Sequence, residues 1–277
     1  MNSEQNAKAE FFLAMHNAPP ILVLPNAWDA ASARIFEKAG ARAIATTSAG
    51  VAFSLGHPDG QRVPRDLMLE AIGRIAAAVR VPVTADVEAG YGSAPQEIAE
   101  TTRRVIQAGA VGLNLEDARN DSPQPLFSLQ EQVERIQAAR EYSEDANVRV
   151  VINARTDVFL GQVGEPAKRL DETVRRANAY RSAGADCLFI PGVTDAATIS
   201  ELVRQISGPL SVLVGPGMPT TAELQNIGVA RVSVGSAIMR AAMALARDAA
   251  VELLDKGSYA AFLDRTIPFR ELNGLMN

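Results

Sequence analysis

Short apolar runs recur along the chain and alternate with longer segments of helical spacing. Four of these runs follow a glycine, in AGARAIATTS (39–48), AGAVGLNLED (108–117), AGADCLFIPG (183–192) and IGVARVSVGS (227–236). Glycine suits the left-handed position that ends a helix, and the apolar run behind it has the composition of a strand. The pattern therefore indicates a junction from helix to strand that is repeated four times.

Four further strand-like runs fill the gaps, namely ILVLP (21–25), VPVTADV (81–87), VRVVINAR (148–155) and PLSVLVGP (209–216). The segments with helical spacing include Leu67–Val79, Gln96–Ala108, Leu129–Tyr142, Glu165–Ala183 and Thr220–Gly228. Strands that alternate with helices, without two-residue hairpin turns, are typical of a parallel sheet. We predict an α/β fold, a (β/α)₈ barrel formed by a single domain over residues 1–277, because such a barrel occupies about 250 residues.

The last forty residues exceed what the eighth barrel helix needs. Ile238–Leu254 has helical spacing, and a break and a further helix are predicted after it. Extra helices at the end of a barrel commonly serve assembly. We therefore expect residues 237–277 to form a helical assembly segment.

The composition narrows the class of partner. The 277 residues carry a net charge of −5 and no run of five Lys or Arg, which argues against nucleic acid or an anionic membrane surface. The single cysteine, Cys187, cannot form an internal disulfide. No basic leader with an apolar stretch and no apolar run of about 18 residues is present, so we expect a cytoplasmic protein that acts on small molecules.

Three consecutive strands end in polar side chains that are two positions apart. These pairs are Asp86 and Glu88, Asn114 and Glu116, and Asn153 and Arg155. Side chains two apart on a strand share a face, and the carboxyl ends of barrel strands are where active sites form. The sequence thus predicts that acids from neighbouring strands, and one guanidinium group, meet at one mouth of the barrel, with Val87 facing the helices.

Crowded carboxylates repel one another unless a cation compensates them. Oxygen ligands suit Mg²⁺, or Mn²⁺, and no cluster of His or Cys offers a zinc site. A surface salt bridge would explain any one of these acids, but three acids on adjacent strands favour a metal site.

A second polar patch follows the second strand. Its small residues would expose backbone N–H groups that can bind a carboxylate, and they are Thr46, Thr47, Ser48, Ala49 and Gly50. The same loop continues into GHPDG (56–60), which adds His57 and Asp59. Asp59 is either part of the site or an ordinary turn aspartate.

Together these residues resemble the isocitrate lyase/phosphoenolpyruvate mutase superfamily. The matching stretches follow the family's order: LPNAWDAASARIFEKAG, TTSAGVAFSLGHPDG, DVEAGYG, GLNLED and INARTD. The resemblance implies a (β/α)₈ barrel that exchanges its terminal helix with a neighbouring subunit in a homodimer or homotetramer.

The resemblance also implies roles for individual residues. It implies Mg²⁺ held by Asp86, directly or through waters with Asp59, Glu88 and Glu116. Ser48 and the Ala49 backbone match positions that bind the carboxylate of a 2-oxo acid, with Thr47, Gly50 and Asn153 beside them. Arg155 matches the arginine that binds substrate oxygens. Glu88 stands where the family often has Asp.

Departures from the family decide between its reactions. The stretch ARNDSPQPLFS (118–128) lacks the catalytic cysteine loop of isocitrate-type lyases, and Cys187 is expected to be a buried, inert thiol inside a strand. Enzymes that cleave phosphonates carry a lysine and an asparagine in this loop and a histidine on the sixth strand, where Ile190 stands here. Asn120, Asp121, Ser122 and Gln124 could still contact such a substrate. The Arg119–Phe127 loop is a candidate lid.

Schiff-base chemistry lacks its nucleophile. The chain has only four lysines, and none follows a predicted strand; they are Lys8, Lys38, Lys168 and Lys256.

The prediction that remains is a Mg²⁺-dependent lyase that breaks a C–C bond of a small, oxaloacetate-like 2-oxo or 2-hydroxy carboxylate through a metal-stabilised enolate. Tyr91, Glu116 and His57 are the candidate general bases. Two alternatives stay open: an enzyme that acts on the P–C bond of phosphonopyruvate, and a 2-oxo acid binding protein with little catalysis.

Overall fold

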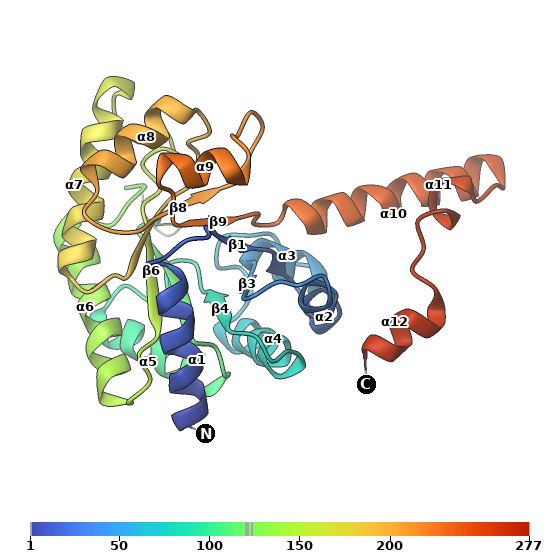
Figure 1. Ribbon diagram of the computed structural model, residues 1–277, viewed down its shortest axis with the longest axis horizontal. Coiled ribbons are helices and arrows are strands. Elements are labelled where there is room, and N and C mark those ends of the chain that lie inside the picture. The colour runs from blue at the N-terminus through green and yellow to red at the C-terminus, as the bar shows by residue number, and fades with distance from the viewer. Residues whose placement is uncertain (1, 120–121, 123, 277) are drawn as a thin grey trace.

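One closed parallel sheet forms the centre of the molecule (Figure 1). The computed structural model describes residues 2–119, 122 and 124–276. Nine strands lie in the order β1-β9-β8-β7-β6-β5-β4-β3-β2. Their bounds are β1 Leu22–Leu24, β2 Asn26–Ala27, β3 Ile44–Thr46, β4 Val83–Asp86, β5 Gly112–Glu116, β6 Val151–Arg155, β7 Cys187–Ile190, β8 Leu210–Leu213 and β9 Arg231–Ser233. All eight predicted strand runs are confirmed.

Pro25 explains why nine strands form an eight-stranded barrel. It separates β1, which pairs with β9, from β2, which pairs with β3. Proline has no N–H for a sheet ladder, so one continuous segment is divided into two short strands. Asn26 reinforces this closure, because its amide donates to Thr46 O at 2.9 Å and its Oδ1 accepts from Val234 N at 2.9 Å. The predicted (β/α)₈ barrel is confirmed.

Helices surround the sheet (Figure 1). The described residues form α1 Asn2–Met15, α2 Ala30–Lys38, α3 Ser48–Ser54, α4 Arg65–Ala78, α5 Pro95–Gln107, α6 Leu129–Asp145, α7 Arg169–Ser182, α8 Ala196–Gln205, α9 Thr221–Ile227, α10 Ala237–Lys256, α11 Ala260–Leu263 and α12 Phe269–Leu275, with a 3₁₀ helix at Pro166–Lys168. The predicted helical segments are confirmed with shifted ends. None of the helices in these described ranges is both long and apolar enough to cross a lipid bilayer.

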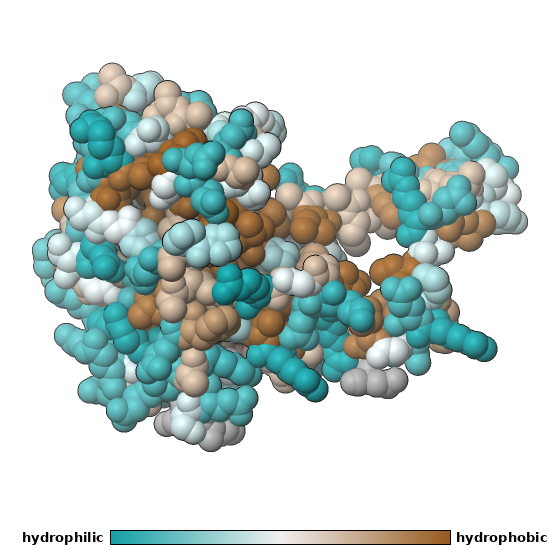
Figure 2. Space-filling view, in the orientation of Figure 1, coloured by the Kyte–Doolittle hydropathy of each residue, from teal (hydrophilic) through white to brown (hydrophobic). Residues whose placement is uncertain are grey.

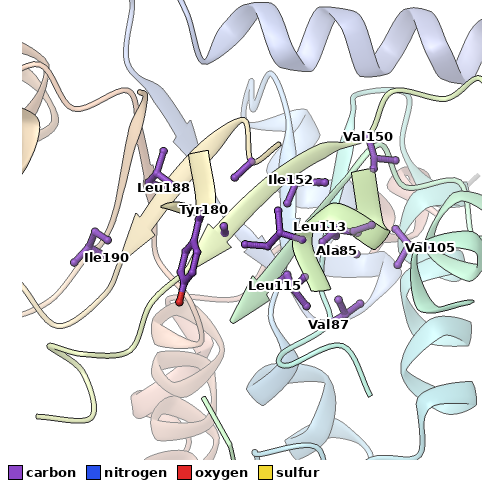
Figure 3. Packing of buried hydrophobic residues seen from close by; sticks show 14 of the residues in the cluster. Ala85, Val87, Val105, Leu113, Leu115, Val150, Ile152, Tyr180, Leu188 and Ile190 are labelled. Carbon is purple, nitrogen blue, oxygen red and sulfur yellow. The ribbon is translucent and has the colours of Figure 1, made fainter. Parts of the chain in front are cut away.

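Alternation along the strands separates the core from the site. Leu113, Leu115 and Ile152 are almost fully buried and pack toward the helices, where Val105 of α5 meets them (Figure 3). Each such side chain contributes roughly 1.5–3 kcal/mol by leaving water. The residues between them on β5 and β6 therefore face the barrel interior.

Helix α1 closes the amino end of the barrel. Its Phe12 is fully buried among residues at or just before the strand starts, such as Leu22 and Val111. A Cβ on Gly112 would lie only 2.9 Å from Phe12 Cε1, so the aromatic ring fills space that a side chain on β5 would need. The open end of the barrel is consequently the carboxyl end.

Candidate active site

Strand register brings the predicted polar pairs together. Asp86 of β4 lies opposite Asn114 of β5, which lies opposite Asn153 of β6. Glu116 and Arg155 lie opposite each other, two residues nearer the carboxyl ends of these strands. Asn153 Nδ2 donates to Asn114 Oδ1 at 2.8 Å. The expectation that these strand ends meet is confirmed.

Asp86 is held by neighbours on strands β3 and β5 and at the start of helix α3. Its backbone N–H donates to Thr46 Oγ1 at 2.8 Å, which ties β4 to β3. The Ser48 N–H donates to Asp86 Oδ2 at 3.0 Å, and Asn114 Nδ2 lies 3.4 Å from Asp86 Oδ1. The side chain is only 8% exposed. A carboxylate with donors on both oxygens is held in a fixed plane.

Glu88 reaches the site by a turn and not by strand alternation. Strand β4 ends at Asp86, and Glu88 has a left-handed φ of 53°. The Gln61 N–H donates to Glu88 Oε2 at 2.6 Å and draws the carboxylate toward the loop after β3. Val87 is buried in the core as predicted (Figure 3). The shared side of Asp86 and Glu88 thus has a different origin from the one expected.

Burial and, after it, like charges raise the pKa values of the acids in the site. Burial, followed by the charges of Asp86 and Asp59, raises the pKa of Glu88 to about 8. Asp59 is more exposed, yet desolvation and the Asp86 charge raise its pKa as well. Burial also raises the pKa of Glu116, while the cation of Arg155 opposes that rise. The acids therefore form one repelling cluster that a cation would stabilise.

Arg155 is gripped by two carboxylates. Its Nη1 lies 2.8 Å from Glu116 Oε2, and its Nε and Nη2 donate to Asp157 Oδ1 and Oδ2 at 2.5 and 2.8 Å. Asp157 is placed by its own N–H, which donates to Asp117 Oδ1 at 2.9 Å. Asp157 was not predicted as a site residue, although it stands two positions after Arg155 in INARTD.

The donor set fits a magnesium ion bound largely through water. In the described ranges no three side chains of His, Cys, Asp or Glu come close enough to coordinate one ion together. Mg²⁺ commonly takes one or two protein carboxylates and completes its octahedron with waters and substrate oxygens. Asp86 at the centre, with Asp59, Glu88 and Glu116 around it, matches that requirement.

The small residues after β3 begin helix α3. Thr47 caps it by accepting from Gly50 N at 3.3 Å. A Cβ on Gly50 would lie 2.6 Å from Thr47 Cγ2, so packing explains this glycine. The Ser48 N–H is used by Asp86, whereas the Ala49 N–H makes no hydrogen bond with any described residue. Ala49 is therefore the best placed of the four to bind an anion.

The candidate bases differ in placement. Burial, then the charges of Glu88 and Asp86, raises the pKa of Tyr91, so its hydroxyl stays protonated and suits a hydrogen-bond donor better than a base. That hydroxyl is buried without a partner among the described residues. The ring of His57 is partly exposed and makes no hydrogen bond to the acids in the described part of the chain.

A cavity of about 320 Å³ opens beside these groups. The loops after β3, β4 and β5 line it, with Gln61, Arg62, Tyr91, Ser93, Arg119 and Phe127 among the contributors. Such a volume suits a small ligand. Asn120 and Asp121, which were expected to contact a substrate from the last of these loops, lie outside the described residues.

Cys187 and the lysines take no part in the site. Cys187 lies within β7, is fully buried, and has its pKa raised to about 12 by burial. The expected burial is confirmed. Lys8 is in α1, Lys38 ends α2, Lys168 is in the 3₁₀ helix and Lys256 ends α10, so none of them reaches a strand end.

The parallel eight-stranded barrel, with acids and an arginine at the carboxyl ends of its strands, places the protein among the (β/α)₈ barrels that have an acidic site. The chain belongs to the phosphoenolpyruvate phosphomutase family, whose model matches residues 12–254, and hence to the isocitrate lyase/phosphoenolpyruvate mutase superfamily. The predicted superfamily is confirmed.

Relatives with solved structures or curated names support this membership. A crystallised protein of Burkholderia cenocepacia J2315, described only provisionally as a lyase or mutase, is 40% identical, with a TM-score of 0.92 over 98% of this chain and 96% of its own. The 2-methylisocitrate lyase of Escherichia coli K12 is 30% identical over 88% of this chain and 84% of its own. The structure of oxaloacetate acetylhydrolase with its product oxalate is 27% identical, with a TM-score of 0.86 over 97% and 93% of the two chains.

Proposed function

We propose that this protein is a Mg²⁺-dependent lyase that breaks a C–C bond next to the carbonyl group of a small 2-oxo or 2-hydroxy carboxylate, with oxaloacetate as the model substrate. One observation carries the proposal. Asp86, fixed by Ser48 and Asn114, shares the barrel mouth with Arg155, and neither a cysteine nor a lysine stands at the carboxyl end of a strand. Such a site can stabilise charge but offers neither a thiol nor an amine as a covalent nucleophile.

The residues divide the chemistry among them. Asp86, with Asp59, Glu88 and Glu116, would hold the Mg²⁺ ion, which when bound supplies Lewis-acid polarisation of the substrate carbonyl. The Ala49 N–H and the start of α3 bind the substrate carboxylate. Arg155, held rigid by Glu116 and Asp157, stabilises the negative charge that develops on the carbonyl oxygen as the bond breaks. The protonated Tyr91 hydroxyl donates a hydrogen bond into the same space.

The relatives point the same way. Both 2-methylisocitrate lyase and oxaloacetate acetylhydrolase carry names that denote the cleavage of small carboxylic acids. Their names do not fix the substrate of this chain, so the acid and the bond are part of the proposal.

Phosphonopyruvate is the second candidate substrate, because the matching family model bears the name of phosphoenolpyruvate phosphomutase. The missing loop lysine and the apolar Ile190 weigh against it. The third alternative is a protein that binds 2-oxo acids with little turnover.

The test is a side-by-side assay of oxaloacetate and phosphonopyruvate with and without Mg²⁺, in which pyruvate and phosphate are followed. Asp86→Ala is the test variant, and Asp66→Ala, which removes an exposed carboxylate of α4 paired with Arg104, is its control. Pyruvate from oxaloacetate that needs Mg²⁺ and is lost only in Asp86→Ala supports the lyase. Phosphate released from phosphonopyruvate supports the P–C enzyme, and binding without product supports the binding protein.

We also propose that residues 237–277 join subunits in a homodimer or homotetramer. Helix α10 runs outward from the barrel (Figure 1), and only Met239 of its residues is buried. Leu254 and Phe269 are each 82% exposed. Figure 2 displays hydrophobic residues on the surface of this segment. Exposed apolar side chains of this size are typical of an interface, and exchange of helices between subunits stays a prediction.

A further inference from the structure

A buried arginine lies beneath the acidic cluster. Arg231 points from β9 into the barrel, and its side chain is fully buried, with the ring of Phe12 centred 6.0 Å from its guanidinium carbon. No carboxylate pairs with it in the described part of the chain. Burying a charge without a counter-charge costs several kcal/mol. A role for Arg231 is therefore sought in the contacts that its guanidinium group makes.

Its protein hydrogen bond goes to Asn114. Arg231 Nη2 donates to Asn114 Oδ1 at 3.3 Å, and Asn153 Nδ2 donates to the same oxygen at 2.8 Å. A guanidinium group can only donate. If the Asn114 amide turned over, its NH₂ group would face donors from both neighbours. The two contacts therefore fix the orientation of the Asn114 amide, with Oδ1 toward Arg231 and Asn153.

The orientation of Asn114 is transmitted to Asp86. With its oxygen turned toward Arg231, the Asn114 amide must present Nδ2 to Asp86 Oδ1, at 3.4 Å. The Ser48 N–H holds the other oxygen. Burial lowers the pKa of Arg231 to about 10, while interactions with Cys187 and Asp86 oppose the change, so the group is a cation at neutral pH. A positive charge thus lies below the carboxylate without touching it.

We propose that Arg231 is a positioning residue for the divalent-cation site, acting through Asn114 to orient the carboxylate of Asp86. The inference rests on the proposed function only in taking Asp86 as a metal ligand. Residues behind a ligand commonly change metal affinity by about 10–100-fold when they are removed. Arg231 differs from the acids of the mouth because it approaches from the closed side of the barrel and touches neither metal nor substrate.

The test measures Mn²⁺ binding directly, from the loss of the electron paramagnetic resonance signal of free Mn²⁺. We expect Arg231→Met to weaken binding about tenfold. Arg231→Lys keeps the cation and one donor nitrogen, and its Mn²⁺ affinity is expected to fall between those of the Met variant and wild type. It serves as the test if the Met variant does not fold. Ser211→Ala is the matched control, since Ser211 faces Arg231 across the β8–β9 pair but makes no hydrogen bond to Asn114.

A double-mutant cycle separates positioning from general damage. If Arg231 acts through Asn114, then Arg231→Met has little further effect on Mn²⁺ affinity in an Asn114→Ala background. Fully additive losses, unchanged affinity in both Arg231 variants, or a wild type that binds no Mn²⁺ would overturn the inference. Oxaloacetate turnover is measured separately. Wild type that binds Mn²⁺ tightly but cleaves nothing would count against the proposed lyase and leave the positioning result standing.

Discussion

Arg155 combines charge with planar geometry. Its Nε and Nη2 donate to Asp157 and its Nη1 pairs with Glu116, and a guanidinium group has five N–H donors, so donors remain for a substrate oxygen. Lysine would keep the charge but lose the planar pair of donors that binds two oxygens at once. We expect Arg155→Lys to lower kcat/KM for oxaloacetate by about 100-fold with the fold intact by circular dichroism. Arg175→Lys, on the exposed face of α7 beside Glu172, is expected to leave the rate unchanged. Equal rates for both variants would remove Arg155 from the mechanism.

Glu88 makes the stability of the metal-free protein depend on pH. Its pKa rises from 4.5 to about 8 on folding, so the protonated form is favoured in the folded state. The associated stability is present below pH 4.5 and is lost as the pH rises through about 8. In EDTA, the thermal midpoint of wild type should fall between pH 5 and 8, and Glu88→Gln should reduce that fall.

The control for this titration is Glu134→Gln, which alters an exposed glutamate of α6. It should follow the wild-type curve. A Glu88→Gln curve that also follows wild type would mean that another group causes the dependence. Mg²⁺ should stabilise wild type more at pH 8 than at pH 5, because the ion binds the ionised acids.

Some residues of the site could be predicted from the sequence and others could not, for physical reasons. Asp86, Glu116 and Arg155 were found because acids and arginine at strand ends are conspicuous in sequence. Arg231 was hidden in the apolar run IGVARVSVGS, where nothing in the sequence says which side of the strand faces inward. Asp157 follows its strand by two residues, and only the fold of that loop turns it back onto Arg155.

At the scale of elements, the turn after β4 has three residues with positive φ, namely Glu88, Gly90 and Tyr91. Gly90 has φ 84°, and a Cβ there would lie 2.6 Å from Ile98 Cδ1. Gly40 has φ 97° but open space around it. Gly40→Ala should cost about 1–2 kcal/mol from its backbone alone. We expect Gly90→Ala to cost more in urea unfolding, because Ile98 must also move; equal costs would show that the contact is relieved freely.

Helix α6 supports the same turn. Arg135 is fully buried, donates to Ala89 O, and lies 3.8 Å from the centre of the Phe127 ring. It thereby joins the turn after β4 to the end of the 119–127 loop. The eight strands were predictable because their apolar composition is a local signal, and a glycine that stops the preceding helix marks four of them. This cross-link was not predictable, because it depends on packing between segments 46 residues apart.

For the whole molecule, the exposed apolar side chains of residues 237–276 allow a test of assembly. Leu254→Asp together with Phe269→Asp places charges on its two most exposed apolar side chains. We expect this variant to have a lower mass than wild type by multi-angle light scattering, since an interface cannot bury unpaired charges cheaply. Leu160→Asp, at a 45% exposed leucine of the barrel, is the control and should keep the wild-type mass. A wild type that is already monomeric would refute the assembly role.

The closure of the amino end by α1 and Phe12 determines how a substrate enters and how products leave. Since α1 seals the amino end of the barrel, molecules enter and leave by the carboxyl end alone. When one substrate is split in two, the fragment nearer the solvent has to depart first and the fragment held by the metal and Arg155 last. The inner fragment should accordingly compete with fresh substrate for the site, whereas the outer one should not.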